Sequence, residues 1–321
     1  GLRKRLESAG VDGELMEGNT LFIRTWSKKM SLLPAAALAL VSVLLFSAFS
    51  GGKCSGVAAQ DEKQAVIFAV NDMHATLDNF PKLAYIVDSL RKVYPGMLLV
   101  SAGDNQTGNP VNDQYPERGY PMIDLMNTVG FNLSAVGNHE FDCTPKGFAG
   151  LTHKAGFDFL CANVVPDNSL DMRLSPYKII TLPNGLRLAF FSLLQINQNG
   201  IPDTHPDNTH GFTFLDPFKT AREYLFLKDK CDILIALTHL GFESDVMLAD
   251  SMPAGIDLII GGHSHTLVRD EQIHNGILIT QAGSKLKFGT LIKLTLGSDG
   301  SLKRTAQLID IKDAKKEDPS V

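Results

Sequence analysis

Short apolar runs alternate with polar clusters from Gln64 onwards, and stretches with helical spacing separate many of them. The apolar runs have the length and composition of buried strands. Over residues 80–93, apolar side chains recur every three or four positions, which is typical of an amphipathic helix. Strands that alternate with helices predict an α/β sandwich. The predicted strands are 65–70, 97–100, 131–136, 157–163, 232–238 and 256–260, and the predicted helices are 80–93, 122–129 and 217–228.

The second half of the chain predicts additional sheet. Asn184-Gly185 is a strong hairpin signal between two apolar runs. The charged tail at 312–321 is expected to be frayed, as chain ends often are. The remaining predicted segments are hairpin strands at 177–182 and 186–194, strands near 277–281, 290–296 and 302–311, and loops at 106–119 and 195–208.

The N-terminal region has the pattern of an export signal. Lys28 and Lys29 precede Met30 and a long uncharged apolar run over 31–52, which is the order of a secretory signal. We interpret 30–59 as a signal peptide or membrane anchor and 1–29 as an over-extended gene model or a fusion. Cleavage before Gln60, lipidation at Cys54 and retention as an anchor of about 20 residues all remain open. Each predicts an exported protein, either periplasmic or membrane-anchored.

Charge and cysteine content restrict the kinds of binding partner and covalent cross-link that the sequence predicts. The net charge is −5, with 30 basic and 35 acidic residues, so no basic surface favours binding to a nucleic acid polymer. Outside the export region there are three cysteines, which form no CxxC pair and argue against a disulfide framework. We expect Cys143, Cys161 and Cys231 to be small buried residues.

The richest polar cluster is Gly137-Asn138-His139-Glu140-Phe141-Asp142, directly after a predicted strand. Gly137 is expected to allow a sharp turn. Asn138 offers a neutral oxygen, and His139 offers an acid or base that titrates near neutrality. Asp142 is close enough in sequence to orient that imidazole. Glu140 is expected to have a structural role.

Four further polar clusters also follow predicted strands, where open α/β sheets bind ligands. Each has an ordinary structural interpretation on its own, as a turn, a loop contact or a core histidine. Together the five offer enough nitrogen and oxygen ligands for two divalent ions, with Asp104 as the shared carboxylate. Because no cysteine takes part, zinc, manganese or a similar ion is indicated. The four clusters are Asp72-Met73-His74, Gly103-Asp104, Thr238-His239 and Gly261-Gly262-His263-Ser264-His265.

In these motifs and their order, the region 64–311 resembles the calcineurin-like metallophosphoesterases, and most closely the catalytic domain of the 5′-nucleotidase family. The resemblance implies a four-layer α/β/β/α sandwich with two packed mixed sheets. It implies two bound metal ions with one shared ligand. The implied ligands are Asp72, His74, Asp104 and His265 for one ion, and Asp104, Asn138, His239 and His263 for the other.

The resulting hypothesis is a dinuclear phosphoesterase. A hydroxide that bridges the ions would attack phosphorus, and His139, oriented by Asp142, would protonate the leaving oxygen. Secreted 5′-nucleotidases usually carry a second, C-terminal domain that grips the base, and the given sequence ends before one. The substrate is therefore expected to be a small phosphoester, with a nucleotide favoured. A separate substrate-binding chain, a phosphatase or phosphodiesterase of other substrates, and an accessory subunit with a vestigial site are the alternatives.

Overall fold

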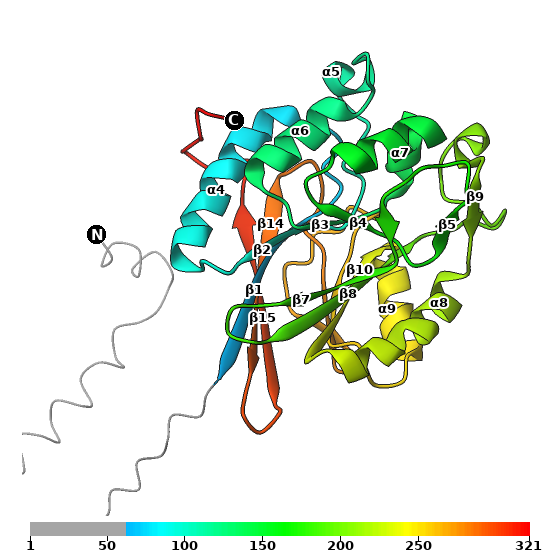
Figure 1. Cartoon of the computed structure of the whole chain (residues 1–321). Coiled ribbons are helices and arrows are strands. Elements are labelled where there is room, and N and C mark those ends of the chain that lie inside the picture. The colour runs from blue at the N-terminus through cyan, green and yellow to red at the C-terminus, as the bar shows by residue number, and fades with distance from the viewer. Residues whose placement is uncertain (1–61) are drawn as a thin grey trace, which may run out of the picture. The chain divides into compact units, whose positions relative to one another are not determined.

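Two mixed β-sheets pack face to face, and helices cover the outer face of each (Figure 1). The computed structural model describes residues 62–321. All of the described residues belong to one unit. This arrangement confirms the expected four-layer sandwich. The predicted export segment and Cys54 lie outside the described residues.

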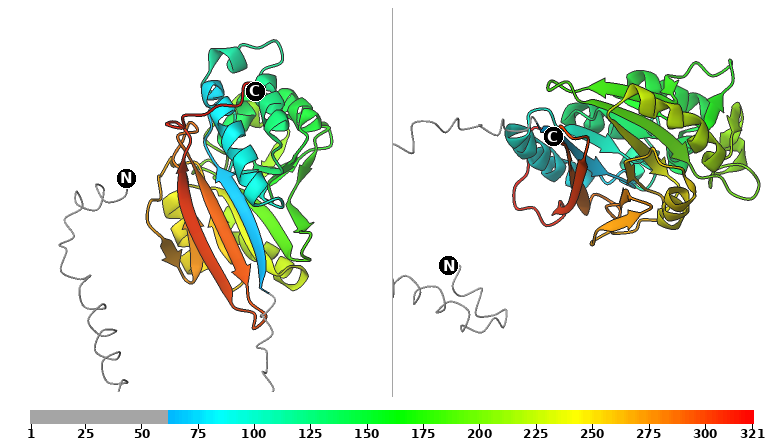
Figure 2. Two further views of the ribbon diagram at one scale, coloured as in Figure 1. Left: turned by 90° about the vertical axis from the view of Figure 1, so that its left-hand side faces the viewer. Right: turned by 90° about the horizontal axis from the view of Figure 1, so that it is seen from below.

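The first sheet has seven strands, in the order β15-β14-β1-β2-β3-β4-β6. From β1 to β6 the neighbours are parallel, whereas β14 runs antiparallel to both β1 and β15. These last three strands lie side by side in Figure 2. Their bounds are β1 (Lys63–Val70), β2 (Leu98–Ser101), β3 (Leu133–Ala135), β4 (Asp158–Leu160), β6 (Leu174–Ser175), β14 (Phe288–Leu296) and β15 (Leu302–Asp310).

The second sheet has six strands, in the order β12-β13-β11-β10-β8-β7. Its central strands are parallel, and the edge strands β12 and β7 are antiparallel to their neighbours. The predicted Asn184-Gly185 hairpin is observed between β7 and β8. The strands are β7 (Tyr177–Thr181), β8 (Arg187–Leu194), β10 (Ile233–His239), β11 (Leu258–Ile260), β12 (Gln272–His274) and β13 (Ile277–Thr280).

Three apolar layers hold the sandwich together. The central layer lies between the sheets and includes Ile67, Phe190 and Ile235, all completely buried. One outer layer joins the first sheet to α4 (Phe80–Val93), α6 (Tyr120–Val129) and α7 (Pro145–Lys154). The other joins the second sheet to α8 (Pro217–Glu223), η6 (Tyr224–Lys230) and α9 (Phe242–Ser251). The three described cysteines are buried and unpaired, as predicted.

Short elements occupy the connections, including parts of the predicted loops. Figure 1 shows α5 above α6 and the small β5–β9 ribbon beyond α7. These elements are η3 (Leu77–Asn79), α5 (Pro110–Asp113), η4 (Asn138–Cys143), β5 (Val164–Pro166), η5 (Pro206–Thr209) and β9 (Phe212–Phe214).

The C-terminal tail differs from its prediction, because it lies along α4 instead of fraying. The backbone N–H of Asp318 donates to the carbonyl of Pro81 at 2.9 Å, and Val321 packs against the outer core layer. Lys82 Nζ donates to the carbonyl of Lys312 at 2.7 Å. These backbone contacts hold a segment whose charged composition gave no sign of them.

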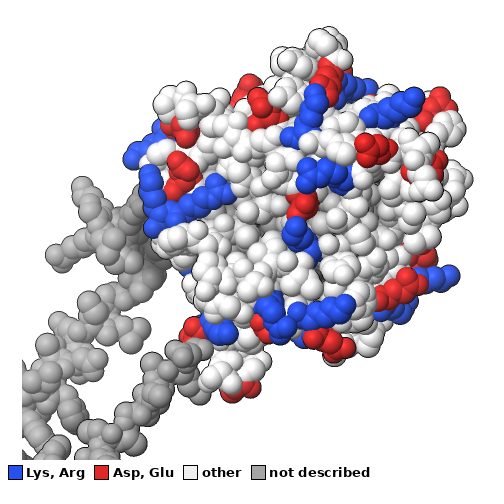
Figure 3. Space-filling view, viewed as in Figure 1, with Lys and Arg blue, Asp and Glu red and all other residues white. Residues whose placement is uncertain are grey.

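The surface carries both signs of charge. On the face in Figure 3, Lys and Arg side chains are interspersed with Asp and Glu. Across residues 62–321, no helix combines the length and the apolar character that a membrane span requires.

Candidate metal centre

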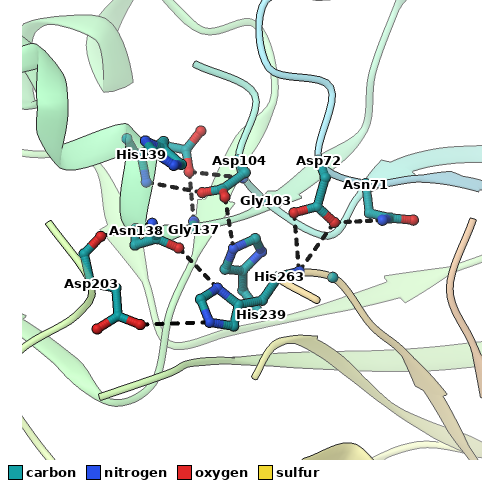
Figure 4. Close-up of polar contacts among 12 residues, drawn as sticks. Asn71, Asp72, Gly103, Asp104, Gly137, Asn138, His139, Asp203, His239 and His263 are labelled. Atoms are coloured by element: carbon teal, nitrogen blue, oxygen red, sulfur yellow. Dashed lines mark hydrogen bonds and ion pairs between the residues drawn. The ribbon is translucent and has the colours of Figure 1, made fainter. Parts of the chain in front are cut away.

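The seven predicted ligands converge where strands of the two sheets end. The first sheet contributes residues that follow β1, β2 and β3, and the second contributes residues from the ends of β10 and β11. The close-up in Figure 4 shows five of them, Asp72, Asp104, Asn138, His239 and His263, brought together at the junction of the sheets. The set is Asp72, His74, Asp104 and Asn138 from the first sheet and His239, His263 and His265 from the second.

One half of the cluster contains Asp72, His74 and His265, whose potential ligand atoms all lie within 4.8 Å of one another. His265 Nε2 lies 3.4 Å from Asp72 Oδ1 and 2.9 Å from His74 Nε2. Two atoms that bind one ion at about 2.0–2.2 Å lie roughly 3 Å apart. The spacing of these three side chains therefore fits a shared cation.

The other half contains Asp104, His239, His263 and Asn138. His239 Nε2 lies 3.2 Å from Asp104 Oδ2, and His263 Nδ1 lies 3.0 Å from Asn138 Oδ1. Asp104 Oδ2 also lies 3.9 Å from His74 Nε2 in the first half. One carboxylate oxygen of Asp104 therefore faces both halves, which is the position that a bridging ligand requires.

The chemistry of His239 tests whether a cation fits. Its Nδ1 lies 2.7 Å from the carbonyl of Ala102, which can only accept, so Nδ1 carries the hydrogen. The opposite nitrogen, Nε2, is completely buried, has no hydrogen-bond partner and is directed at the Asp104 carboxylate. When Nε2 is unprotonated, two acceptor atoms face each other in a buried site, and they need a positive charge between them, either a proton or a metal ion. The donor set therefore fits a divalent metal ion.

The pKa values of Asp104 and the histidines reflect how strongly these clustered side chains interact. Burial opposes charge on His239, but attraction to Asp104 prevails and raises the pKa of His239 to about 10. The pKa of Asp104 is lowered despite its burial, because His239 and His139 stabilise the carboxylate. Burial lowers the pKa of both His74 and His263, so these imidazoles are neutral at pH 7. His74 and His263 are therefore in the protonation state that binds metals, whereas His239 would release its proton when an ion binds.

Five of the seven residues have left-handed backbone conformations. The φ angles are 50° for Asp72, 47° for His74, 50° for Asp104, 79° for His263 and 56° for His265. Asp72 and His74 are two residues apart but do not share a face of extended chain, because both follow β1 with left-handed φ angles. Non-glycine residues adopt such angles only where the surroundings enforce them, and they concentrate at functional sites.

Gly137 also differs from its predicted role. Its φ of −99° and ψ of −179° are extended, so no sharp turn requires glycine here. A Cβ at this position would lie 2.2 Å from Asp104 Oδ1 and 2.4 Å from Asp104 N. Glycine is needed because the loop after β3 approaches Asp104 so closely.

Glu140 is buried beneath the cluster, in the structural role expected for it. Its carboxylate accepts hydrogen bonds from the backbone N–H groups of Gly137 at 2.6 Å, Asn105 at 2.8 Å and Asp104 at 3.1 Å. These bonds tie the loop after β2 to η4, so they hold Asp104 and Asn138 side by side.

His139 and Asp142 form a dyad at the edge of the cluster. His139 Nδ1 lies 2.7 Å from Asp142 Oδ2, and the His139 ring packs edge-on against His74, with 5.1 Å between ring centroids. The hydrogen bond that His139 donates to Asp142 raises the pKa of His139 above its ordinary value. Thr107 and Thr204 donate to Asp142 at 2.9 and 3.0 Å. The dyad therefore places a partly exposed imidazole, whose charged form Asp142 stabilises, beside the candidate metal ligands.

Sequence reasoning missed several residues that support the cluster. Asn71 and Gln281 form hydrogen bonds that hold the loops carrying Asp72, His263 and His265. Thr107 lies beside both His74 and Asp142. Asp203 and Thr204, in a segment predicted only as a loop, contact Asn138, His263 and Asp142. No local pattern marks these residues, because their partners are distant in sequence.

A two-sheet sandwich with a histidine- and carboxylate-rich cluster at the junction of its sheets defines a metal-binding α/β protein. The sequence model of the calcineurin-like phosphoesterases matches residues 65–267, and the chain belongs to this family. The predicted family is thus confirmed.

The similar proteins include enzymes named as nucleotidases. The 5′-nucleotidase of Vibrio cholerae serotype O1 is 34% identical over 183 residues, which cover 52% of this chain and 32% of that protein. The uncharacterized metallophosphoesterase YunD of Bacillus subtilis is 26% identical over 239 residues, 72% of this chain and 50% of YunD. The structure of a 5′-nucleotidase precursor from Thermus thermophilus superimposes with a TM-score of 0.69 at 25% identity, covering 80% of this chain and 56% of that one. The chain thus spans half or less of the length of these curated relatives.

Proposed function

We propose that this chain is an exported phosphoesterase that uses two divalent metal ions to hydrolyse nucleotides. The observation that carries the proposal is the buried, unpartnered Nε2 of His239, which faces the Asp104 carboxylate at 3.2 Å. That pair costs free energy unless Nε2 is protonated or a metal ion lies against both atoms, and a bound ion would take the place of the proton.

Each ion would be held by four side chains, and Asp104 would contribute to both. When bound, zinc, manganese or similar ions supply Lewis acidity, which offsets charge on phosphoryl oxygens and activates water at neutral pH. The ligands of one ion would be Asp72, His74, Asp104 and His265, and those of the other Asp104, Asn138, His239 and His263.

The chain's own residues account for the proton transfer. When charged, His139 holds a proton on each ring nitrogen, and its Nδ1–H donates a hydrogen bond to Asp142. Nε2 remains free to donate its proton to the leaving oxygen of the ester. Asp142 in turn is fixed by Thr107 and Thr204, which keeps the imidazole in one orientation. His139 is therefore the general acid of the proposed reaction.

The substrate class follows from the relatives. Those named 5′-nucleotidase support a nucleotide monoester as the substrate. Because the chain matches only part of each, a separate substrate-binding chain remains part of the proposal as a partner. Export, with or without an N-terminal membrane anchor, rests on the Lys28-Lys29 pair and the apolar run after it. Cell fractionation of the full chain would contradict export if all of the protein stayed in the cytoplasm.

The test combines metal content with hydrolysis. The purified chain is stripped with a chelator, reloaded with Mn²⁺ or Zn²⁺, and assayed against AMP and bis-p-nitrophenyl phosphate. We expect two ions per chain and AMP hydrolysis that disappears on chelation and in Asp104→Asn. The matched control is Asp207→Asn, an exposed aspartate outside the cluster, which should behave as wild type.

Three results would contradict the proposal. Hydrolysis that persists without metal would rule out the metal-dependent reaction, and one bound ion would rule out a dinuclear site. Hydrolysis of bis-p-nitrophenyl phosphate without AMP hydrolysis would instead indicate a phosphodiesterase.

A further inference from the structure

Asp203 lies in the connection between β8 and β9 and is the point at which this connection reaches the metal cluster. Its backbone carbonyl accepts a hydrogen bond from Asn138 Nδ2 at 2.9 Å. Its carboxylate Oδ1 accepts from Asn197 Nδ2 at 3.1 Å, and its Oδ2 lies 3.9 Å from His263 Nε2. Figure 4 shows Asp203 on the far side of Asn138 and His263 from Asp104. One residue thus contacts two of the proposed ligands from behind.

The backbone contact fixes the amide of Asn138. A carbonyl oxygen can only accept, so the group that faces Asp203 must be the NH₂ of Asn138. The amide oxygen then points the other way, toward His263 Nδ1 at 3.0 Å. That oxygen is the atom that would bind a metal ion.

The carboxylate acts on His263 in the corresponding way. An imidazole can bind a metal through one nitrogen only if the other nitrogen carries the hydrogen. Nδ1 of His263 faces Asn138 Oδ1, whereas Nε2 faces the Asp203 carboxylate. A carboxylate at Nε2 favours the tautomer with hydrogen on Nε2, which leaves the lone pair of Nδ1 for the ion.

Two other proposed ligands are oriented by backbone carbonyls instead. His239 uses the carbonyl of Ala102 at 2.7 Å, and His74 uses that of Thr107 at 3.2 Å. His263 has a side-chain carboxylate in the equivalent place, and this side chain is about half exposed. The orientation of His263 can therefore be altered by mutation without disturbing the buried backbone.

We propose that Asp203 is a positioning residue that orients both Asn138 and His263 toward the second metal ion, the one that does not contact Asp72. This inference rests on the proposed function, since it assumes the two-ion site. The proposed role predicts that a mutation at this position affects the binding of one ion and not of the other. Loss of the carboxylate weakens one of two binding steps and leaves the fold and the other step in place.

The test measures metal binding directly, by calorimetric titration of the stripped full chain with Mn²⁺. We expect Asp203→Ala to weaken one binding step about 10–100-fold, the usual effect of removing a carboxylate that orients a metal-bound histidine. Asp203→Asn should recover part of this loss, because its amide oxygen can also face Nε2 of His263 as an acceptor. His74→Ala identifies the other step, which it should weaken instead.

Controls separate this role from general damage. Asp207→Ala removes a carboxylate that is 78% exposed, lies in the same connection and pairs with His205, so it should bind both ions as wild type does. The visible absorption of the Co²⁺-loaded chain reports ligand geometry and should change in Asp203→Ala but not in Asp207→Ala.

Several outcomes would overturn the inference. These are wild-type affinity in Asp203→Ala, equal weakening of both steps, or the same weakening in Asp207→Ala. Equal loss in Asp203→Asn and Asp203→Ala would show that an acceptor at this position does not orient His263 and would overturn the positioning role. Two bound ions in a wild-type chain that hydrolyses no phosphoester would contradict the proposed function alone, since binding still tests Asp203.

Discussion

Replacing Gly137 by alanine tests how closely the loops of the metal centre are packed. The added Cβ would lie 2.2 Å from Asp104 Oδ1 and 2.4 Å from Asp104 N, whereas ordinary contacts to a Cβ begin near 3.4 Å. Asp104 or the loop after β3 must therefore move by about 1 Å. Because φ at Gly137 is −99°, alanine suffers no backbone strain there, and the whole effect is steric.

The expected loss combines two contributions. Overpacking of a dense region costs typically about 1–3 kcal/mol. Moving Asp104 also strains its hydrogen bond from His139 N, at 2.9 Å, and a bond to a charged group contributes about 1.5–3 kcal/mol. Since the contributions overlap, we expect the free energy of unfolding to fall by about 2–4 kcal/mol. For a domain of this size that is a fall in Tm of roughly 4–16 °C.

Calorimetry and metal titration of the stripped protein provide the assay. Gly150→Ala is the matched control, because Gly150 lies in α7 with nothing within 4 Å of an added Cβ. Alanine should raise stability there by about 0.5–1 kcal/mol. Gly137→Ala should also bind both ions more weakly, since Asp104 is shared. Wild-type stability and wild-type metal affinity in Gly137→Ala would refute the packing argument.

Three further predictions concern the acid, a buried carboxyl and the metals. His139→Asn should lower kcat for AMP about 10²–10⁴-fold but affect p-nitrophenyl phosphate, whose leaving group needs no proton, far less; equal losses in steady-state assays would refute the acid role. Burial raises the pKa of Asp245 to about 8, from 3.8, so between these values the folded state holds the extra proton and stability falls as pH rises. Asp245→Asn keeps an acceptor for Thr238. In urea titrations from pH 5 to 9 it should flatten that fall, and above pH 8 its free energy of unfolding should exceed that of wild type; an unchanged slope would contradict the burial argument. Mn²⁺ at 100 times its Kd should add about 2.7 kcal/mol per site to the free energy of unfolding, and a Tm independent of Mn²⁺ would count against a folded-state metal site.

Elements with a strong periodic signal could be predicted from the sequence alone. The helix predicted over 80–93 coincides with α4, because Leu83 and Val87 repeat at helical spacing and Pro81 begins the first turn. By contrast, α7 and α9 were not predicted. Two glycines interrupt α7, and α9 buries the polar Asp245, so neither shows a clean apolar stripe.

The convergence of these seven side chains could be predicted, because each lies at or shortly after the end of a strand and carries a group that can bind a metal. The backbone conformations that present them could not. Left-handed angles at Asp72 and His263 arise from tertiary contacts, and local propensity disfavours them. Likewise, Asp203 is 65 residues from Asn138 in sequence, and nothing in its own segment indicates that contact.

The two sheets each contribute part of the site, so residues that never touch an ion govern its dimensions. Side chains such as Ile67, Phe190 and Ile235 set how far apart the sheets stand, a separation of about 10 Å in packed sheets. Replacing Phe190 with a smaller residue would let the strand ends approach or tilt, and the histidines of the second sheet would then shift relative to the carboxylates of the first. The size of the core side chains between the sheets could therefore be changed to alter which ion and which ester the site accepts, while every polar residue of the cluster stays the same.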